Sequence, residues 1–183
     1  NLGNTYLRLH NVNQAIEQLK EAIELKPDYP EAYNDLGNAY SEKHDYHKAA
    51  TSFRRVIELT PNFAPAYNSL GNAYYQLRRF AEAKEQFSKG LVLSPDSFQL
   101  QFNLGSANVS LHHYSNAVTC FQAALRIAPN DARVIYSLGI AYLGLKDRSA
   151  SLEQYSILQN LNPDLATRLY QQIYLGRVLV VDD

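Results

Sequence analysis

Four asparagines recur at two fixed spacings, and their amides are the most regular candidates for chemistry in the sequence. Asn34 and Asn38 lie four residues apart, and the same pair returns 34 residues later as Asn68 and Asn72. Asparagine is a poor helix former, so its recurrence in helical sequence needs a reason. Each amide offers donors and an acceptor, so these residues, here called the amide rows, could hydrogen-bond the backbone of an extended peptide. The alternative is that they bridge neighbouring helices or face water.

Further along the chain, the positions equivalent to the amide rows carry mostly apolar and aromatic residues. The same 34-residue shift leads from Asn68 to Phe102 and then to Tyr136. Exposed side chains of this kind usually mark a binding site, here a pocket for aromatic or aliphatic anchors of a partner peptide or helix. The alternative is self-occlusion, in which a C-terminal helix or the apolar tail 178–181 covers them. This apolar patch comprises Tyr75, Phe102, Val109, Tyr136, Ile140 and Leu143.

Catalytic, metal-binding and nucleic-acid-binding signatures are absent. The sequence has no Gly-rich phosphate loop, no H-E-x-x-H and no G-x-S-x-G, which predicts a protein that is not an enzyme and needs no cofactor. Cys120 is alone and is expected to be a packed small hydrophobe; it fits a reducing compartment and favours a cytoplasmic location. The formal net charge of −1 argues against a nucleic-acid partner. Apolar runs are far shorter than the roughly 18 residues of a membrane helix.

These candidates belong to a strict internal repeat. Leu-Gly pairs recur every 34 residues, and prolines recur at the same interval. A period of this length is typical of a helical repeat array. The pairs begin at Leu2, Leu36, Leu70, Leu104 and Leu138, and the prolines are Pro27, Pro61, Pro95, Pro129 and Pro163.

Each repeat is predicted to form two helices. If the Leu-Gly pair is placed at positions 7 and 8, apolar residues at positions 4, 7 and 11 make one helical stripe, and those at 20, 24 and 27 make a second. Glycine inside a helix costs about 1 kcal/mol, so we expect the second helix to cross the first at position 8. Proline at position 32 ends the second helix. The Asp or Asn that follows each proline is expected to cap the next helix; these residues are Asp28, Asn62, Asp96, Asn130 and Asp164.

One helix pair cannot bury its stripe alone, so successive pairs must stack. The predicted fold is therefore all-α, a right-handed α-solenoid of antiparallel helix pairs. A C-terminal helix over 165–176 is expected to cap it. The absence of Met, and a first residue that lies inside a repeat, indicate a fragment or a processed product. The predicted units are a partial repeat 1–29, the repeats 30–63, 64–97, 98–131 and 132–165, and a capping helix with an apolar tail, 166–183.

The pattern closely resembles the tetratricopeptide repeat family, over residues 1 to about 165. The resemblance rests on the aromatic at position 4, Leu-Gly at 7 and 8, Tyr at 11, Ala at 20, an aromatic at 24, Ala at 27 and Pro at 32. Departures such as Asn108 at position 11 and Ser151 at position 20 fall mostly in the C-terminal half. The resemblance implies a concave groove lined by positions 2, 5, 6, 9, 12 and 13 of the first helices. It also implies that the protein binds peptides or assembles complexes.

One known groove chemistry of this family is a two-carboxylate clamp that holds chaperone C-terminal tails. The nearest matching window contains Asn72, Asn103 and Arg133, whereas Asn68 and Ser137 stand where two cations are required. Without those charge-assisted bonds, tight binding of such tails is not expected. Asn103 and Arg133 are nevertheless kept as candidate groove residues for a partner, together with the amide rows and the apolar patch.

Position 15, in the turn between the two helices, forms a basic row. The simplest interpretation is that a basic group at a helix C-terminus meets the negative end of the helix dipole. The alternative is a weak basic edge for an acidic partner, sensitive to pH through its histidines. The row consists of His10, His44, Arg78, His112 and Lys146.

Three functional hypotheses follow. The first is a non-catalytic scaffold that holds a protein or peptide partner in its groove. The second is the substrate-recognition arm of a larger enzyme such as a protein glycosyltransferase, whose asparagine-rich inner helices these resemble. The third is a structural protein that self-associates through its N-terminal end or its C-terminal tail.

Overall fold

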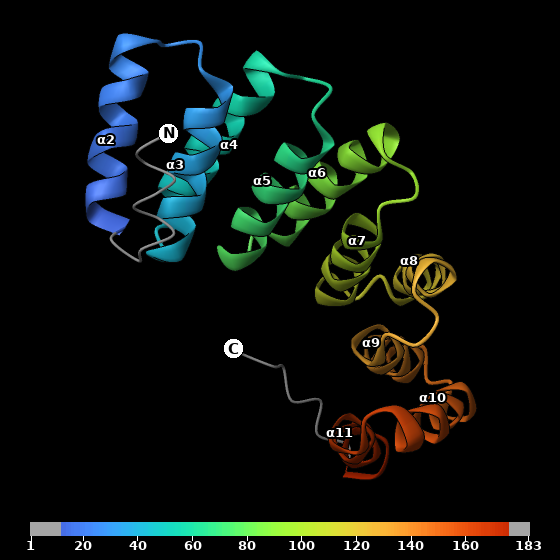
Figure 1. Cartoon of the computed structure of the whole chain (residues 1–183). Helices are drawn as coiled ribbons and strands as arrows, with labels where there is room; N and C mark the ends of the chain where they lie inside the picture. Colours follow the sequence, from blue (N-terminus) through green and yellow to red (C-terminus); the bar gives the residue numbers. More distant parts are fainter. Residues whose placement is uncertain (1–11, 176–183) are drawn as a thin grey trace. The chain divides into compact units, whose positions relative to one another are not determined.

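The computed structural model describes residues 12–175 (Figure 1), and those residues are all-helical apart from short connections. The chain divides into two compact units, residues 1–95 and 96–183. The first contains α2 (Val12–Leu25), α3 (Pro30–Glu42), α4 (Tyr46–Leu59), α5 (Ala64–Gln76) and α6 (Phe80–Leu93). The second contains α7 (Phe98–Ser110), α8 (Tyr114–Ile127), α9 (Ala132–Gly144), α10 (Arg148–Leu161) and α11 (Pro163–Leu175).

Within each unit, helices that follow one another in the sequence pack together. In the first unit, α3 pairs with α4 and α5 with α6, while α4 joins the two pairs by packing on α5. In the second unit, α7 pairs with α8 and α9 with α10, and α8 packs on α9. The predicted all-α fold of antiparallel helix pairs is confirmed.

The glycine at position 8 is the point of closest approach within three of these pairs. A methyl group on Gly37 would lie 2.5 Å from the Phe53 ring, and one on Gly105 would lie 2.5 Å from the Phe121 ring. Gly71 is approached by Phe87 in the same way. The three phenylalanines are almost completely buried. The predicted reason for the glycine, a second helix that crosses there, is therefore confirmed.

The turn between the two helices of a pair adopts the left-handed backbone conformation at position 15. His44 has a φ of 57° and Lys146 a φ of 63°, and Arg78 and His112 have similar values. Backbone bonds close the turn, because Asp45 N donates to Tyr40 O at 2.8 Å and His44 N donates to Ser41 O at 2.9 Å. The four described residues of the basic row thus lie directly after a helix C-cap, the position where glycine is most favourable. The fifth, His10, lies outside the described residues.

Four of the five predicted capping residues lie one position before the observed N-cap, and the fifth, Asp164, lies inside α11. Asp28 lies in a turn with Pro27, and the residue that precedes α3 is Tyr29, which makes no side-chain cap bond. In the second unit, Ser97 and Asp131 cap α7 and α9, respectively. The reason is that the proline and the residue after it form the turn, so the chain enters the helix only one residue later.

The connection between α10 and α11 differs from the others. It consists of Asn162 alone, whereas four residues, such as 128–131, separate a second helix from the next first helix elsewhere in the described chain. Asn162 Oδ1 accepts a hydrogen bond from Leu165 N at 3.1 Å, and Pro163 is the first residue of the helix. The predicted capping helix is confirmed, but it begins at Pro163 and ends at Leu175.

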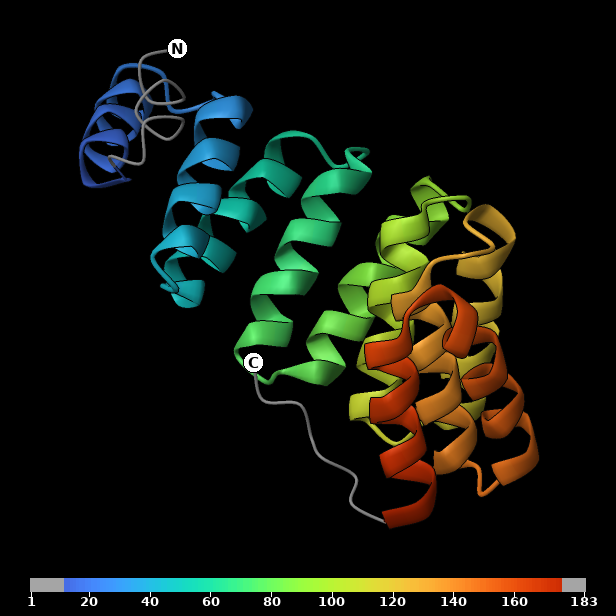
Figure 2. The ribbon, with the colours of Figure 1, turned by 60° about the horizontal axis from the view of Figure 1, so that its bottom comes forward.

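The early start of α11 changes which side chains it buries. Ala166, Leu169 and Ile173 form one apolar cluster with Ile135 of α9 and Leu158 of α10. Figure 2 shows the ribbon of α11, in red, beside those of α9 and α10. A methyl group on Gly139 would lie 2.6 Å from Leu169 Cδ2. In this last pair, therefore, a residue of α11 occupies the place that a phenylalanine of the second helix takes elsewhere.

Candidate functional site

The amide rows lie on α3 and α5 of the first unit, away from the buried stripe. Asn38 and Asn72 are exposed, while Asn34 and Asn68 are partly buried. Successive helical residues are about 100° apart, so Asn38 points about 200° away from the buried Leu36. Each amide carries two donors and an acceptor, which are the groups that bonding to a peptide backbone would require.

The apolar patch is divided between the two units. Tyr75 belongs to the first unit, where its ring packs edge-on against Phe80 with centroids 5.1 Å apart. The other five residues belong to the second unit, where all of them are partly buried. Tyr75 therefore covers the start of α6 in its own unit.

In the second unit, two predicted site residues from neighbouring first helices meet. The Arg133 guanidinium of α9 lies 5.9 Å from the centroid of the Phe102 ring of α7. Phe102 also stacks on Phe98 at 6.3 Å and packs against the buried Phe121 at 5.9 Å. Val109 packs on the same cluster, and Asn103 is partly buried beside Phe102. The result is a half-buried aromatic surface with a cation at its edge.

The α9 part of the patch is partly covered by α11. Tyr136, Ile140 and Leu143 pack against the cluster to which α11 contributes Ala166, Leu169 and Ile173. The Arg168 guanidinium lies 5.7 Å from the Tyr136 ring centroid. Burial raises the pKa of Tyr136, and the positive charge of Arg168 opposes that rise. Cover by a C-terminal helix, one of the two alternatives left open by the sequence, therefore applies to part of the patch. The other, cover by the tail 178–181, lies outside the described residues.

The Arg133 side chain already forms hydrogen bonds at the N-terminus of its own helix, α9. Its Nη2 and Nε donate to the Asp131 carboxylate at 2.6 and 3.1 Å, and the same carboxylate accepts from Arg133 N and Val134 N. The bond from Arg133 holds the pKa of Asp131 below its ordinary value. A tail carboxylate would have to compete with Asp131 for this guanidinium, which supports the prediction that such tails do not bind tightly.

No group of three or more His, Cys, Asp or Glu residues within residues 12–175 could hold a metal ion. Cys120 is buried, and that burial raises the pKa of its thiol, which disfavours a nucleophilic thiolate. None of the described helices is long and apolar enough to cross a membrane.

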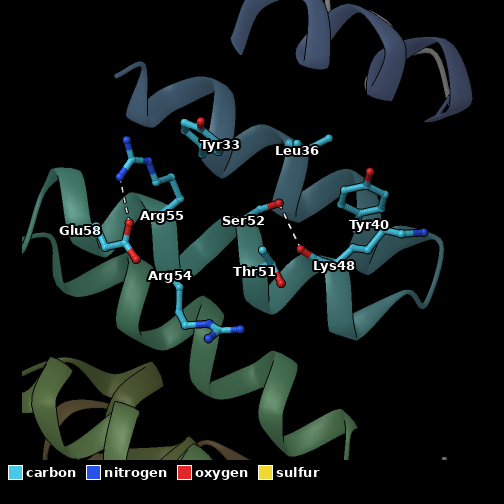
Figure 3. Close-up of a pocket in the computed structure, with 9 residues that line it drawn as sticks. All are labelled: Tyr33, Leu36, Tyr40, Lys48, Thr51, Ser52, Arg54, Arg55 and Glu58. Carbon is cyan, nitrogen blue, oxygen red and sulfur yellow. Dashed lines mark hydrogen bonds and ion pairs between the residues drawn. The ribbon is translucent and has the colours of Figure 1, made fainter. Parts of the chain in front are cut away.

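A surface hollow on the first unit was not anticipated from the sequence. It has a volume of about 530 Å³ and lies between α3 and α4 (Figure 3). The signal that the sequence offers is the adjacent pair Arg54 and Arg55 in a second helix, whose pattern indicates only packing positions. The hollow is lined by Tyr33, Leu36, Tyr40, Lys48, Thr51, Ser52, Arg54, Arg55 and Glu58.

Family comparisons agree with this geometry. A model described as "TPR repeat" matches residues 3–44 and 38–78, and a second model, "Tetratricopeptide repeat", matches residues 68–132. The chain belongs to the tetratricopeptide repeat family. The resemblance drawn from the sequence is therefore confirmed, and this is a family whose members mediate protein–protein interactions.

Several solved tetratricopeptide repeat structures share the fold. The crystal structure of MamA superposes with a TM-score of 0.85 at 20% identity, over 91% of this chain and 98% of that chain. YrrB, described as a TPR protein with an unusual peptide-binding site, gives a TM-score of 0.83 at 21% identity, over 92% and 88%. PilF of Pseudomonas aeruginosa gives 0.75 at 19% identity, over 97% and 90%. A search of curated protein sequences found no match.

Proposed function

We propose that this tetratricopeptide repeat protein is a non-catalytic scaffold that binds a peptide or helix of a partner protein along its first helices. The observation that carries the proposal is the paired placement of Phe102 and Tyr136 in the second unit. Both rings are only partly buried, and each lies within 6 Å of a guanidinium, Arg133 and Arg168, respectively. Such a surface accepts apolar anchors with carbonyl groups beside them.

The amide rows supply a second, sequence-independent element on the first unit. Asn38 and Asn72 are exposed and occupy the same repeat position on α3 and α5. Amides placed in this way can bond an extended main chain whatever its side chains are. Peptide binding in YrrB, a protein of the same fold, supports this choice of ligand.

Selection of random peptides on the immobilised full chain tests the proposal, with affinities then measured by fluorescence anisotropy. The Phe102→Ala/Tyr136→Ala variant removes the aromatic anchors, and the Asn38→Ala/Asn72→Ala variant removes the exposed amides. A selected peptide should bind at least one variant about tenfold more weakly, because truncated central anchors typically cost more than 1 kcal/mol.

A matched control changes Ser115→Ala/Thr119→Ala, two exposed residues of α8 outside the proposed surface. Circular dichroism must show native helix content in every variant. In the asparagine variant alanine is the better helix former, which favours the native helices. Failure to select any peptide, or equal affinity of a selected peptide for all variants and the parent, would overturn the proposal.

A further inference from the structure

The first unit carries two surface hollows that the repeat itself builds. The first, of about 530 Å³, lies between α3 and α4, and the second, of about 390 Å³, is lined by α4, α5 and α6. Each hollow is lined at its base by residues at positions 4, 7 and 11 of a first helix. The base residues of the second hollow therefore lie 34 residues after those of the first. These residues are Tyr33, Leu36 and Tyr40 in one hollow and Tyr67, Leu70 and Tyr74 in the other.

The hollows lie on the opposite side of the first helices from the amide rows. Leu36 lines the first hollow, and Asn38, two residues later, points about 200° away around the helix. The same relation holds for Leu70 and Asn72 on α5. A ligand in the hollows would therefore leave the surface in the proposed function free.

Cations outnumber acids at the rim of the first hollow. Lys48, Arg54 and Arg55 line it, against a single carboxylate, that of Glu58. Arg55 Nη1 bonds Glu58 Oε2 at 2.9 Å, and Lys48 Nζ bonds Asp45 Oδ2 at 2.7 Å. These two pairs leave one further rim cation to be accounted for.

That cation is Arg54, which is exposed and makes no ion pair with any residue between 12 and 175. Arg54 lines both hollows, so it stands on the ridge that separates them. Figure 3 shows its side chain extending away from the Arg55–Glu58 pair. A guanidinium in this position is available for a bidentate bond to a carboxylate.

Aromatic rings make the walls of the first hollow amphipathic. The Arg55 guanidinium lies 5.9 Å from the Tyr33 ring centroid, and Lys48 Nζ lies 5.4 Å from that of Tyr40. Leu36 lies between the two tyrosines along α3. An apolar side chain fits against the rings and the leucine, while an acid beside it reaches the cationic rim.

We propose that this face of the first unit is a second docking surface, which binds an extended acidic segment of a partner protein with apolar residues between its carboxylates. An extended chain advances about 3.3 Å per residue, so a repeated triplet with one acid and one apolar residue places successive acids about 10 Å apart. A nucleic acid is disfavoured because the cationic excess is local and the chain as a whole carries a net charge of −1.

The test uses a fluorescein-labelled peptide of about twelve residues that repeats the triplet Glu-Leu-Ser, a design that follows from that spacing. Its affinity for the full chain is measured by anisotropy at low and at physiological salt. A peptide with Gln in place of Glu should bind about tenfold more weakly or worse, because charge-assisted bonds are lost. The Arg54→Gln variant should weaken binding of the acidic peptide about five- to tenfold.

Lys20→Gln is the matched control, since Lys20 is an exposed cation at the same repeat position one repeat earlier and lines neither hollow. It should bind the acidic peptide as the parent does, and so should Asn38→Ala/Asn72→Ala. The proposal is overturned if Arg54→Gln binds like the parent, if Lys20→Gln weakens binding equally, or if the Gln peptide binds as well. Tighter binding of a duplex DNA oligomer than of the acidic peptide would overturn the choice of partner.

Discussion

The regular helix pairs and the C-terminal group α9–α11 use the same glycine in two different ways. In α3/α4, α5/α6 and α7/α8, a buried phenylalanine of the second helix fills the space over the glycine. In the C-terminal group, Leu169 of α11 fills that space over Gly139, while Tyr155, the counterpart of those phenylalanines, is only partly buried. Tyr155 instead packs on the exposed Tyr170, with ring centroids 5.5 Å apart.

A repeat motif therefore specifies where two helices approach each other, but not which side chain fills the space over the glycine. The partner is decided by where the next helix begins. At the C-terminal connection, Asn162 caps α11 directly, Pro163 takes the first helical position and Asp164 lies in the first turn. All three features favour a helix start at this point. The early start brings Leu169 over Gly139 and Arg168 over Tyr136.

The largest effect on stability is expected from truncating the side chains that pack over the glycines. Phe121→Ala should lower the free energy of unfolding by about 3–5 kcal/mol and Leu169→Ala by about 2–5 kcal/mol, because both side chains are fully buried. Tyr155→Ala should cost only about 1–2 kcal/mol. Urea unfolding followed by circular dichroism measures all three. A Tyr155→Ala loss as large as that of Phe121→Ala would contradict the contrast between the two regions.

A smaller effect is expected from filling the glycine positions. Gly105→Ala places a methyl group 2.5 Å from the rigid Phe121 ring, so it should destabilise by about 1–3 kcal/mol despite the gain in helix propensity. Gly139→Ala should cost less, because the atom it meets is the flexible end of Leu169, at 2.6 Å. Thermal unfolding of the two variants gives the ranking. The reverse ranking would show that the C-terminal contact is the more rigid one.

The smallest effect is expected at the connection itself. Asn162→Ala removes the side chain that caps α11 and should cost about 1 kcal/mol. Ser94→Ala is the matched control, since Ser94 holds the same repeat position at the end of α6 and caps no first helix. That control should change stability by less than about 0.5 kcal/mol. Equal losses in the two variants would mean that the cap does not set the start of α11.

Much of the fold could be predicted from the sequence because its determinants are local and repeated. The stripe Tyr33, Leu36 and Tyr40 predicts a helix with one buried face, and Gly37 predicts a crossing, which Phe53 provides. Four of the predicted capping residues lie one residue too early, as Asp28 does because it belongs to the turn with Pro27, and Asp164 lies inside α11. The strength of the period also led to Pro163 being interpreted as a helix terminator, although Asn162 followed by Pro163 is equally a helix-start signal.

The candidate site was less predictable, because it depends on contacts between helices far apart in sequence. The apolar character of Phe102 and Tyr136 is visible in the sequence, but the guanidinium over each ring comes from a different helix. The role of these residues and of the amide rows in binding stays a prediction. Arg54 and Arg55 were visible as charges, yet no sequence pattern assigned them to a hollow with the rings of α3.

The sequence alone is enough to predict the period, the helix pairs, the glycine crossing points and the family, because each depends on residues within one repeat. Three features depend on tertiary packing and are visible only in the structure. Leu169 replaces a phenylalanine over Gly139, and α11 covers part of the apolar patch. Arg54 lines both hollows of the first unit. The physical reason is that periodic side-chain patterns fix local helices, whereas burial and charge at a surface depend on where separate helices bring their side chains together.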